Sequence, residues 1–278
     1  MKITLPTLAD LTLTISAEPD GQSDYPTATL QKGLLLTYRD QVLAEEAVGF
    51  GVPVLKYGLQ ALFPRTVRLD LLQETPQWIV RARYTLNLVE RIAGRRQAIV
   101  KSPLFYTSKD LLAALIRRIP ALRNALTRLS SAARRTFGWR TTYESAGFGA
   151  EVGLVYIFDP QAGNLQVRLE PESLPLQTAT ELVIMNEQGA RYFDCYEEPS
   201  GVRLRGKEIG CWDEVHAAEA GFSSSALGIR FSVPQVAGAR LFRGRELVGS
   251  RLAWAGFGHA IPMPVEGFEY TLRLEKIS

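Results

Sequence analysis

Hydrophobic and polar residues alternate along several stretches of this chain. Across residues 78–88 every even position is hydrophobic, and arginine, threonine or asparagine fills the odd positions from Arg81 onward. Residues 268–274 repeat the alternation, with acidic, hydroxyl and basic side chains between the apolar ones. A period of two places successive side chains on opposite faces of a strand. The pattern therefore predicts β-strands with one apolar face.

The same reasoning predicts strands along most of the chain. Residues 152–158 and 165–169 form a predicted hairpin around the turn Asp159–Asn164. Further strands are predicted at 11–16, 28–38, 41–48, 52–57, 65–72, 97–101, 181–186, 190–196, 202–209, 227–233, 238–243, 246–248 and 251–257. Short connections rich in Gly, Pro, Asn and Asp favour antiparallel sheets packed face to face, and the helices that parallel crossovers need are missing. We predict one mainly β domain over residues 1–278, a large antiparallel β-sandwich that could take the super-sandwich form.

One segment departs from the strand rhythm. Between Ser108 and Arg135, leucine and isoleucine recur at spacings of three and four, which places them on one helical stripe. Ser108 is a plausible N-cap, and Pro120 should kink or divide the helix. We therefore predict a helical insertion at about residues 103–138.

This insertion is strongly basic, and we call residues 108–135 the basic arm. Residues 101–140 contain nine Lys and Arg residues against Asp110 alone, whereas the net charge of the whole chain is only +3. The leucine stripe could pack on the protein's own sheet and leave the arginines solvated, or a second copy of the chain or an acidic protein partner could dock on the arm through its arginines. Nucleic acid and anionic lipid are weaker alternatives, because no aromatic residues are interleaved with the arginines. The arginines proposed for contact are Arg117, Arg118, Arg128, Arg134 and Arg135.

Composition and missing motifs narrow the function classes. The chain has 46% hydrophobic and 22% charged residues, which excludes wholesale disorder. The sequence shows no signal peptide and no apolar run long enough to span a bilayer, so we expect a cytoplasmic protein. Two cysteines, Cys195 and Cys211, are expected to be buried free thiols, although one bridge stays open. Walker, GxSxG and HExxH motifs are absent, and we expect no metal and no cofactor.

The first candidate site lies in the segment from Glu208 to His216. Trp212, Asp213, Glu214 and His216 stand close together there, next to glycines that suit an irregular loop. A tryptophan can stack on the apolar face of a sugar ring, and carboxylates can bind hydroxyl groups or transfer protons. The alternative is a polar loop in which Trp212 anchors the chain to the core.

The second candidate site is formed by polar and aromatic residues near the C-terminus, namely Arg243, Arg245, Glu246, Trp254 and His259. His259 follows Gly256 and Gly258 and could act as an acid or base near neutral pH. His259 and His216 could belong to one site only if their two loops lay at the same edge of the sandwich. Structural roles for both histidines stay open.

These observations lead to two hypotheses of different classes. The first is a carbohydrate-binding or carbohydrate-modifying β-sandwich, with Asp213, Glu214 and His259 as candidate catalytic groups and Trp212 and Trp254 as stacking platforms. The second is a non-enzymatic assembly module that uses the basic arm. Enzymatic and purely binding roles both stay open, and the carbohydrate hypothesis rests on analogy between folds.

Overall fold

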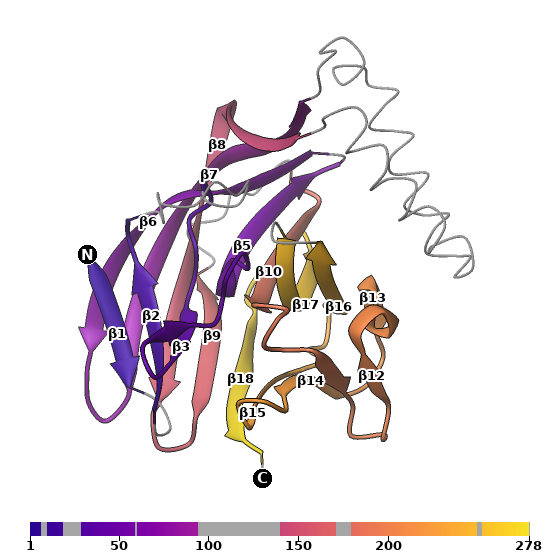
Figure 1. Ribbon diagram of the computed structural model, residues 1–278. Coiled ribbons are helices and arrows are strands. Elements are labelled where there is room, and N and C mark those ends of the chain that lie inside the picture. Colours follow the sequence, from indigo (N-terminus) through magenta and orange to yellow (C-terminus); the bar gives the residue numbers. More distant parts are fainter. Residues whose placement is uncertain are drawn as a thin grey trace.

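The computed structural model describes residues 1–6, 10–18, 29–58, 60–93, 140–170, 179–248 and 252–277 (Figure 1). Within these ranges the protein is mainly β, and all strand pairs in its two sheets are antiparallel. The smaller sheet has four strands in sequential order, β1 (Lys2–Pro6), β2 (Leu11–Ser16), β3 (Leu35–Tyr38) and β4 (Gln41–Val42).

The larger sheet has fourteen strands in the order β12-β11-β14-β15-β18-β9-β8-β7-β6-β5-β10-β17-β16-β13. Its first half along the chain comprises β5 (Gly49–Tyr57), β6 (Gln60–Gln73), β7 (Trp78–Ala93), β8 (Arg140–Asp159), β9 (Asn164–Glu170) and β10 (Glu181–Gln188). Its second half comprises β11 (Cys195–Glu197), β12 (Arg203–Arg205), β13 (Cys211–Val215), β14 (Glu219–Ser224), β15 (Ile229–Pro234), β16 (Arg240–Val248), β17 (Leu252–Pro262) and β18 (Glu269–Lys276). A short 3-10 helix, η3 (Gly206–Ile209), precedes β13.

The large sheet curls so that strands far apart in its order pack against each other. The ring centroids of Phe50 on β5 and Phe231 on β15 lie 5.1 Å apart. Phe257 on β17 lies 5.0 Å from Phe222 on β14, again between ring centroids. The Tyr270 hydroxyl on β18 donates a hydrogen bond of 2.8 Å to Asn186 on β10. Strands β5, β10 and β17 therefore form one layer that faces β14, β15 and β18.

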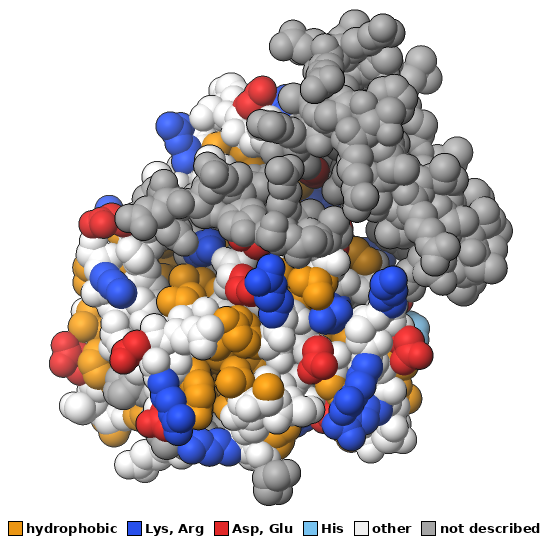
Figure 2. Space-filling view, viewed as in Figure 1, with side chains coloured by type: hydrophobic (Ala, Val, Ile, Leu, Met, Phe, Trp, Pro, Cys, Tyr) orange, Lys and Arg blue, Asp and Glu red, His pale blue; other side chains and the backbone are white. Residues whose placement is uncertain are grey.

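The small sheet covers the long strands on another side of the same core. Figure 1 shows β1, β2 and β3 beside β6–β9. All seven of these strands contribute residues to one hydrophobic cluster, whereas β4 contributes none. An isolated bridge between Leu34 and Phe50 ties the start of β3 to β5. Figure 2 shows acidic and basic side chains interspersed on this side of the molecule, with hydrophobic side chains gathered near the centre of the view.

The structure confirms the mainly β fold with large antiparallel sheets, and it corrects several boundaries. The strands predicted at 238–243 and 246–248 form one strand, β16. Only Gln41–Val42 of the strand predicted at 41–48 is extended, and residues 202–209 divide between β12 and η3. Residues Cys211–Val215, expected in an irregular loop, form β13, and Glu219–Ser224, where no strand was predicted, form β14.

The helical insertion predicted at 103–138, with its basic arm, lies outside the described residues, as does the strand predicted at 97–101. In the described part of the chain, no helix is long and apolar enough to cross a membrane.

We predict that Phe257→Ala lowers the free energy of unfolding by about 3–5 kcal/mol, because it removes a fully buried ring that joins two layers. Urea denaturation followed by circular dichroism measures the change. Leu247→Ala is the control, since Leu247 is 45% exposed and its loss should change stability by less than about 0.5 kcal/mol. Equal effects of the two substitutions would contradict the packing described above.

Candidate functional site

The side chains of β17 point alternately to the core and to the opposite face of the large sheet. Ala253, Ala255 and Phe257 belong to the main core, whereas the intervening positions are Trp254, Gly256 and Gly258. Residues paired across a sheet share a face, so the face opposite the core continues onto β10, β16 and β13. We call this surface the tryptophan face, and define it by Glu187, Trp212, Gly244, Glu246, Trp254, Gly256 and Gly258.

Two tryptophans lie together on this face. The rings of Trp212 and Trp254 are stacked, with centroids 5.1 Å apart and an angle of 29° between their planes. Trp212 is the extra residue of a β-bulge between Cys211 and Asp213, and its φ of +59° is left-handed. Such a conformation is rare for a bulky side chain, and a bulge can redirect one. The local backbone therefore turns Trp212 toward Trp254.

Glycines make room for the two rings. A Cβ atom on Gly258 would lie 2.7 Å from the ring of Trp212, and one on Gly244 would lie 2.6 Å from the ring of Trp254. Any larger residue at either position would push the tryptophans away from the sheet. Trp254 is buried, with 9% of its surface exposed, so the partly exposed ring of Trp212 is the one that the stacked pair presents to solvent.

A buried carboxyl group stands on the same face. Glu187 on β10 pairs with Gly256, is 4% exposed, and accepts a hydrogen bond of 3.4 Å from the Val48 amide. Burial raises the pKa of Glu187 to about 8; the Val48 hydrogen bond opposes this increase and the charge of Glu246 adds to it. Glu187 is consequently a carboxylic acid over much of the neutral range.

Glu246 and Tyr143 are the ionisable neighbours of Glu187. Glu246 lies on β16 opposite Trp254, so β17 separates the two carboxylates. Tyr143 on β8 packs against Phe63 with ring centroids 5.2 Å apart. Burial raises the pKa of Tyr143, and the charges of Glu90 and Glu187 raise it further. The phenol therefore stays protonated beside Glu187.

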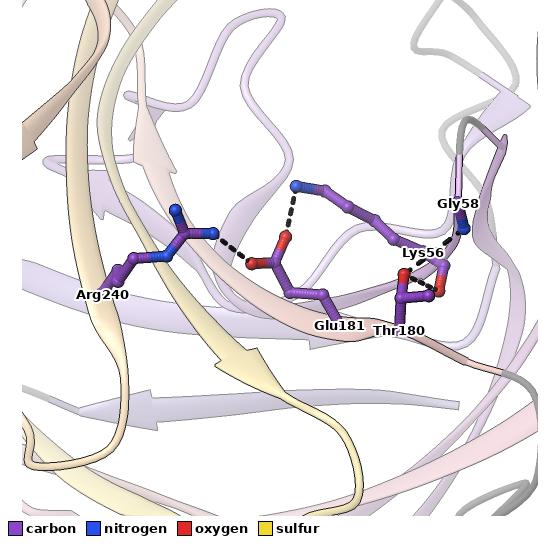
Figure 3. Close-up of polar contacts among 5 residues, drawn as sticks. All are labelled: Lys56, Gly58, Thr180, Glu181 and Arg240. Atoms are coloured by element: carbon purple, nitrogen blue, oxygen red, sulfur yellow. Dashed lines mark hydrogen bonds and ion pairs between the residues drawn. The ribbon is translucent and has the colours of Figure 1, made fainter.

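Glu181 lies on the same face of β10 as Glu187, at the other end of the strand, and forms ion pairs with two cations. Glu181 receives contacts of 2.6 Å from both Lys56 and Arg240, and the neighbouring Thr180 hydroxyl donates to the Lys56 carbonyl (Figure 3). Burial raises the pKa of Glu181, but the hydrogen bonds and charges of the two cations outweigh it and lower the pKa overall. This carboxylate is therefore ionised and bound by two cations, unlike Glu187.

The structure divides the predicted site residues between two faces. Trp212, Glu246 and Trp254 come together, and Glu214 pairs with Phe242 on the same side but is exposed. Asp213, in contrast, pairs with Arg243.

Arg243 and Arg245 lie at alternate positions of β16 that face the core. The Arg243 guanidinium donates to the Ile209 carbonyl and lies 4.5 Å from the centre of the Tyr196 ring. Arg245 donates to the Ala190 carbonyl. Both side chains therefore join chain segments, away from the tryptophan face.

The two histidines do not share an exposed rim. His259 belongs to β17 instead of a loop, is fully buried, and has its Nε2 atom 2.9 Å from the Pro234 carbonyl. Burial lowers the pKa of His259 to about 4, although the Pro234 contact opposes the shift. His216 is exposed just after β13. His259 is thus a neutral residue of the core, because its position in β17 has the parity of Phe257.

Other predictions concern thiols, metals and the basic arm. Neither cysteine is disulfide-bonded; Cys195 is buried as expected, but Cys211 is exposed. Among the residues that the structure describes, no group of three His, Cys, Asp or Glu residues could hold a metal ion. The arginines Arg117, Arg118, Arg128, Arg134 and Arg135 lie outside the described residues.

Sequence reasoning missed Glu187 and Tyr143. The strand predicted at 181–186 ends one residue before Glu187, whereas β10 continues to Gln188. The available signal was an acidic residue, Glu187, at an odd position two residues past the end of the apolar run 182–185. Tyr143 had no comparable signal, because only the packing of β8 places it near β10.

Comparisons with known proteins indicate the fold. No family model matches the chain, and no curated protein has significant sequence similarity to it. Alpha-N-acetylgalactosaminidase NagBb from Bifidobacterium bifidum, in its GalNAc complex, matches 99% of this chain at 10% identity and a TM-score of 0.52. Its Gal-NHAc-DNJ complex matches at 10% identity and a TM-score of 0.50. This chain spans 36% of the NagBb chain in both cases, so the likeness concerns the fold of one part of that enzyme.

We predict that stability depends on pH through Glu187. The unfolded carboxyl group ionises near its ordinary pKa, whereas the folded one keeps its proton until about pH 8. The free energy of unfolding should therefore fall as pH rises from about 4.5 to 8, by a few kcal/mol at about 1.4 kcal/mol per pKa unit. Urea denaturation at pH 5 and pH 8.5 measures the fall.

Glu187→Gln should lose most of this pH dependence, because an amide does not ionise. Glu214→Gln is the control, since Glu214 is exposed. If the Glu187→Gln variant kept the full pH dependence of the unmodified protein, the buried acid would not be its source.

Proposed function

We propose that the tryptophan face binds a carbohydrate. The observation that carries the proposal is the stacked pair Trp212–Trp254 on a floor of glycines, with Glu187 and Glu246 beside it. A sugar ring has an apolar face bordered by hydroxyl groups, so it needs a flat aromatic surface and nearby polar groups.

Local strain supports a binding role for Trp212. A tryptophan with φ of +59° costs conformational energy, and such residues concentrate at functional sites. A core anchor could use an ordinary strand conformation. The bulge instead leaves the ring partly exposed on the surface that also holds the carboxylates.

The likeness to NagBb adds support at the level of the fold. The two NagBb structures are complexes with GalNAc and Gal-NHAc-DNJ, and on this analogy an N-acetylated amino sugar is a reasonable first ligand to test. The tryptophan face itself supports a pyranose ligand without defining which hydroxyl groups are recognised.

Titration with oligosaccharides tests the proposal through tryptophan fluorescence. We expect saturable changes with at least one member of a panel of neutral, acidic and N-acetylated amino sugars, GalNAc among them. Trp212→Ala should weaken binding about tenfold or more, which corresponds to about 1.4 kcal/mol or more of lost contact energy.

Trp78→Phe is the matched control, because Trp78 pairs with Phe158 on β7 and β8, away from the tryptophan face, and its variant should bind normally. Trp212→Phe, which keeps a ring, should bind more tightly than Trp212→Ala, and circular dichroism checks that each variant is folded. No response of the unmodified protein to any sugar in the panel would contradict the proposal.

A further inference from the structure

We propose that Glu187 and Glu246 act as an acid–base pair that hydrolyses a glycosidic bond of the sugar held on the tryptophan face. This inference rests on the proposed carbohydrate binding and assigns a reaction to the same site. It concerns one carboxyl group that sequence analysis did not identify and one that it assigned only to binding.

The register places the two groups on the same face of the sheet, on either side of β17. Glu187 pairs with Gly256, and Gly256 pairs in turn with Gly244. Glu246 lies two residues farther along β16, opposite Trp254. With strands about 4.8 Å apart and a rise of about 3.4 Å per residue, the two Cα atoms are about 12 Å apart. Glutamate side chains can shorten this to the roughly 6.5–9.5 Å at which two carboxyl groups flank a glycosidic bond and a water molecule.

The environments of the two groups differ in the way that acid–base catalysis requires. Glu187 is 4% exposed and lies near the protonated phenol of Tyr143, whereas Glu246 is partly exposed. Burial and the Glu246 charge keep Glu187 protonated at neutral pH, so it can serve as the acid while Glu246 serves as the base.

The reaction balances with water as the only co-reactant. Glu187 donates its proton to the glycosidic oxygen as the bond from that oxygen to the anomeric carbon breaks. Glu246 accepts a proton from the water whose oxygen forms the new bond to the anomeric carbon. Glu187 ends as a carboxylate and Glu246 as a carboxylic acid, and proton exchange with solvent restores both. A direct water attack inverts the anomeric configuration.

The experiment uses the full chain and the oligosaccharide from the panel that gives the largest fluorescence change. We expect release of reducing sugar, with the inverted anomer as the first product in proton NMR. Glu187→Gln and Glu246→Gln should each lower kcat by about 10²–10⁴-fold. Both variants should keep their fluorescence response, and Glu269→Gln, whose exposed side chain lies on β18 in the opposite layer, should keep full activity.

Two further readings separate a proton donor from a structural residue. The rate should fall above about pH 8 in the unmodified protein, as Glu187 loses its proton beside Glu246 and Tyr143. The loss caused by Glu187→Gln should shrink when a 4-nitrophenyl glycoside of the same sugar is the substrate, because nitrophenolate leaves without protonation.

Binding without hydrolysis by the unmodified protein would overturn this inference and leave the proposed carbohydrate binding intact. Retention of configuration, or full activity of either Glu→Gln variant, would likewise overturn the acid–base assignment. Absence of binding to the whole panel would instead remove the proposed function itself.

Discussion

The strict alternation of side chains along hydrogen-bonded strands is the constraint on which this structure depends. In a sheet of fourteen strands, paired residues share a face, so one register fixes the surroundings of every neighbour across the sheet. Strand β17 shows the consequence, because Phe257 enters the core while Gly256 and Gly258 lie on the other face. The candidate site and the core therefore lie on opposite faces of the same hydrogen-bonded strands.

Because the large sheet curls, the same strands contribute one face to the core and the other face to the candidate site. The inner face is closed by aromatic contacts between distant strands, such as Phe50 with Phe231, and by polar links such as Tyr270 with Asn186. These contacts hold β5, β10 and β17 in place. The opposite face can consequently carry features that would weaken a core, namely glycines, a left-handed tryptophan and a buried carboxyl group.

Two glutamates of β10 show how surroundings assign different chemistry to the same side chain. Glu181 and Glu187 lie on the same face of β10, and both are largely buried: Glu187 is 4% exposed and the Glu181 side chain 13%. Lys56 and Arg240 compensate the charge of Glu181, so it stays ionised. Burial raises the pKa of Glu187 and the charge of Glu246 adds to the increase. Among the described residues it accepts one amide hydrogen bond, of 3.4 Å, which does not offset them, so its proton is retained. Because both residues are glutamates, the difference between their pKa values follows from their surroundings, in which positively charged neighbours are near Glu181.

The sequence by itself determined the mainly β architecture, because period-two alternation is a local property of strands such as 78–88. It also identified Trp212, Trp254 and Glu246 as notable residues. Their meeting on one face, the exclusion of Arg243 and Arg245 from it, and the burial of His259 were decided by strand register, which depends on pairing between residues far apart in the chain. Glu187 joined the site for the same reason: its partners Val48, Gly256 and Glu246 are distant in sequence, and only the folded sheet brings them together.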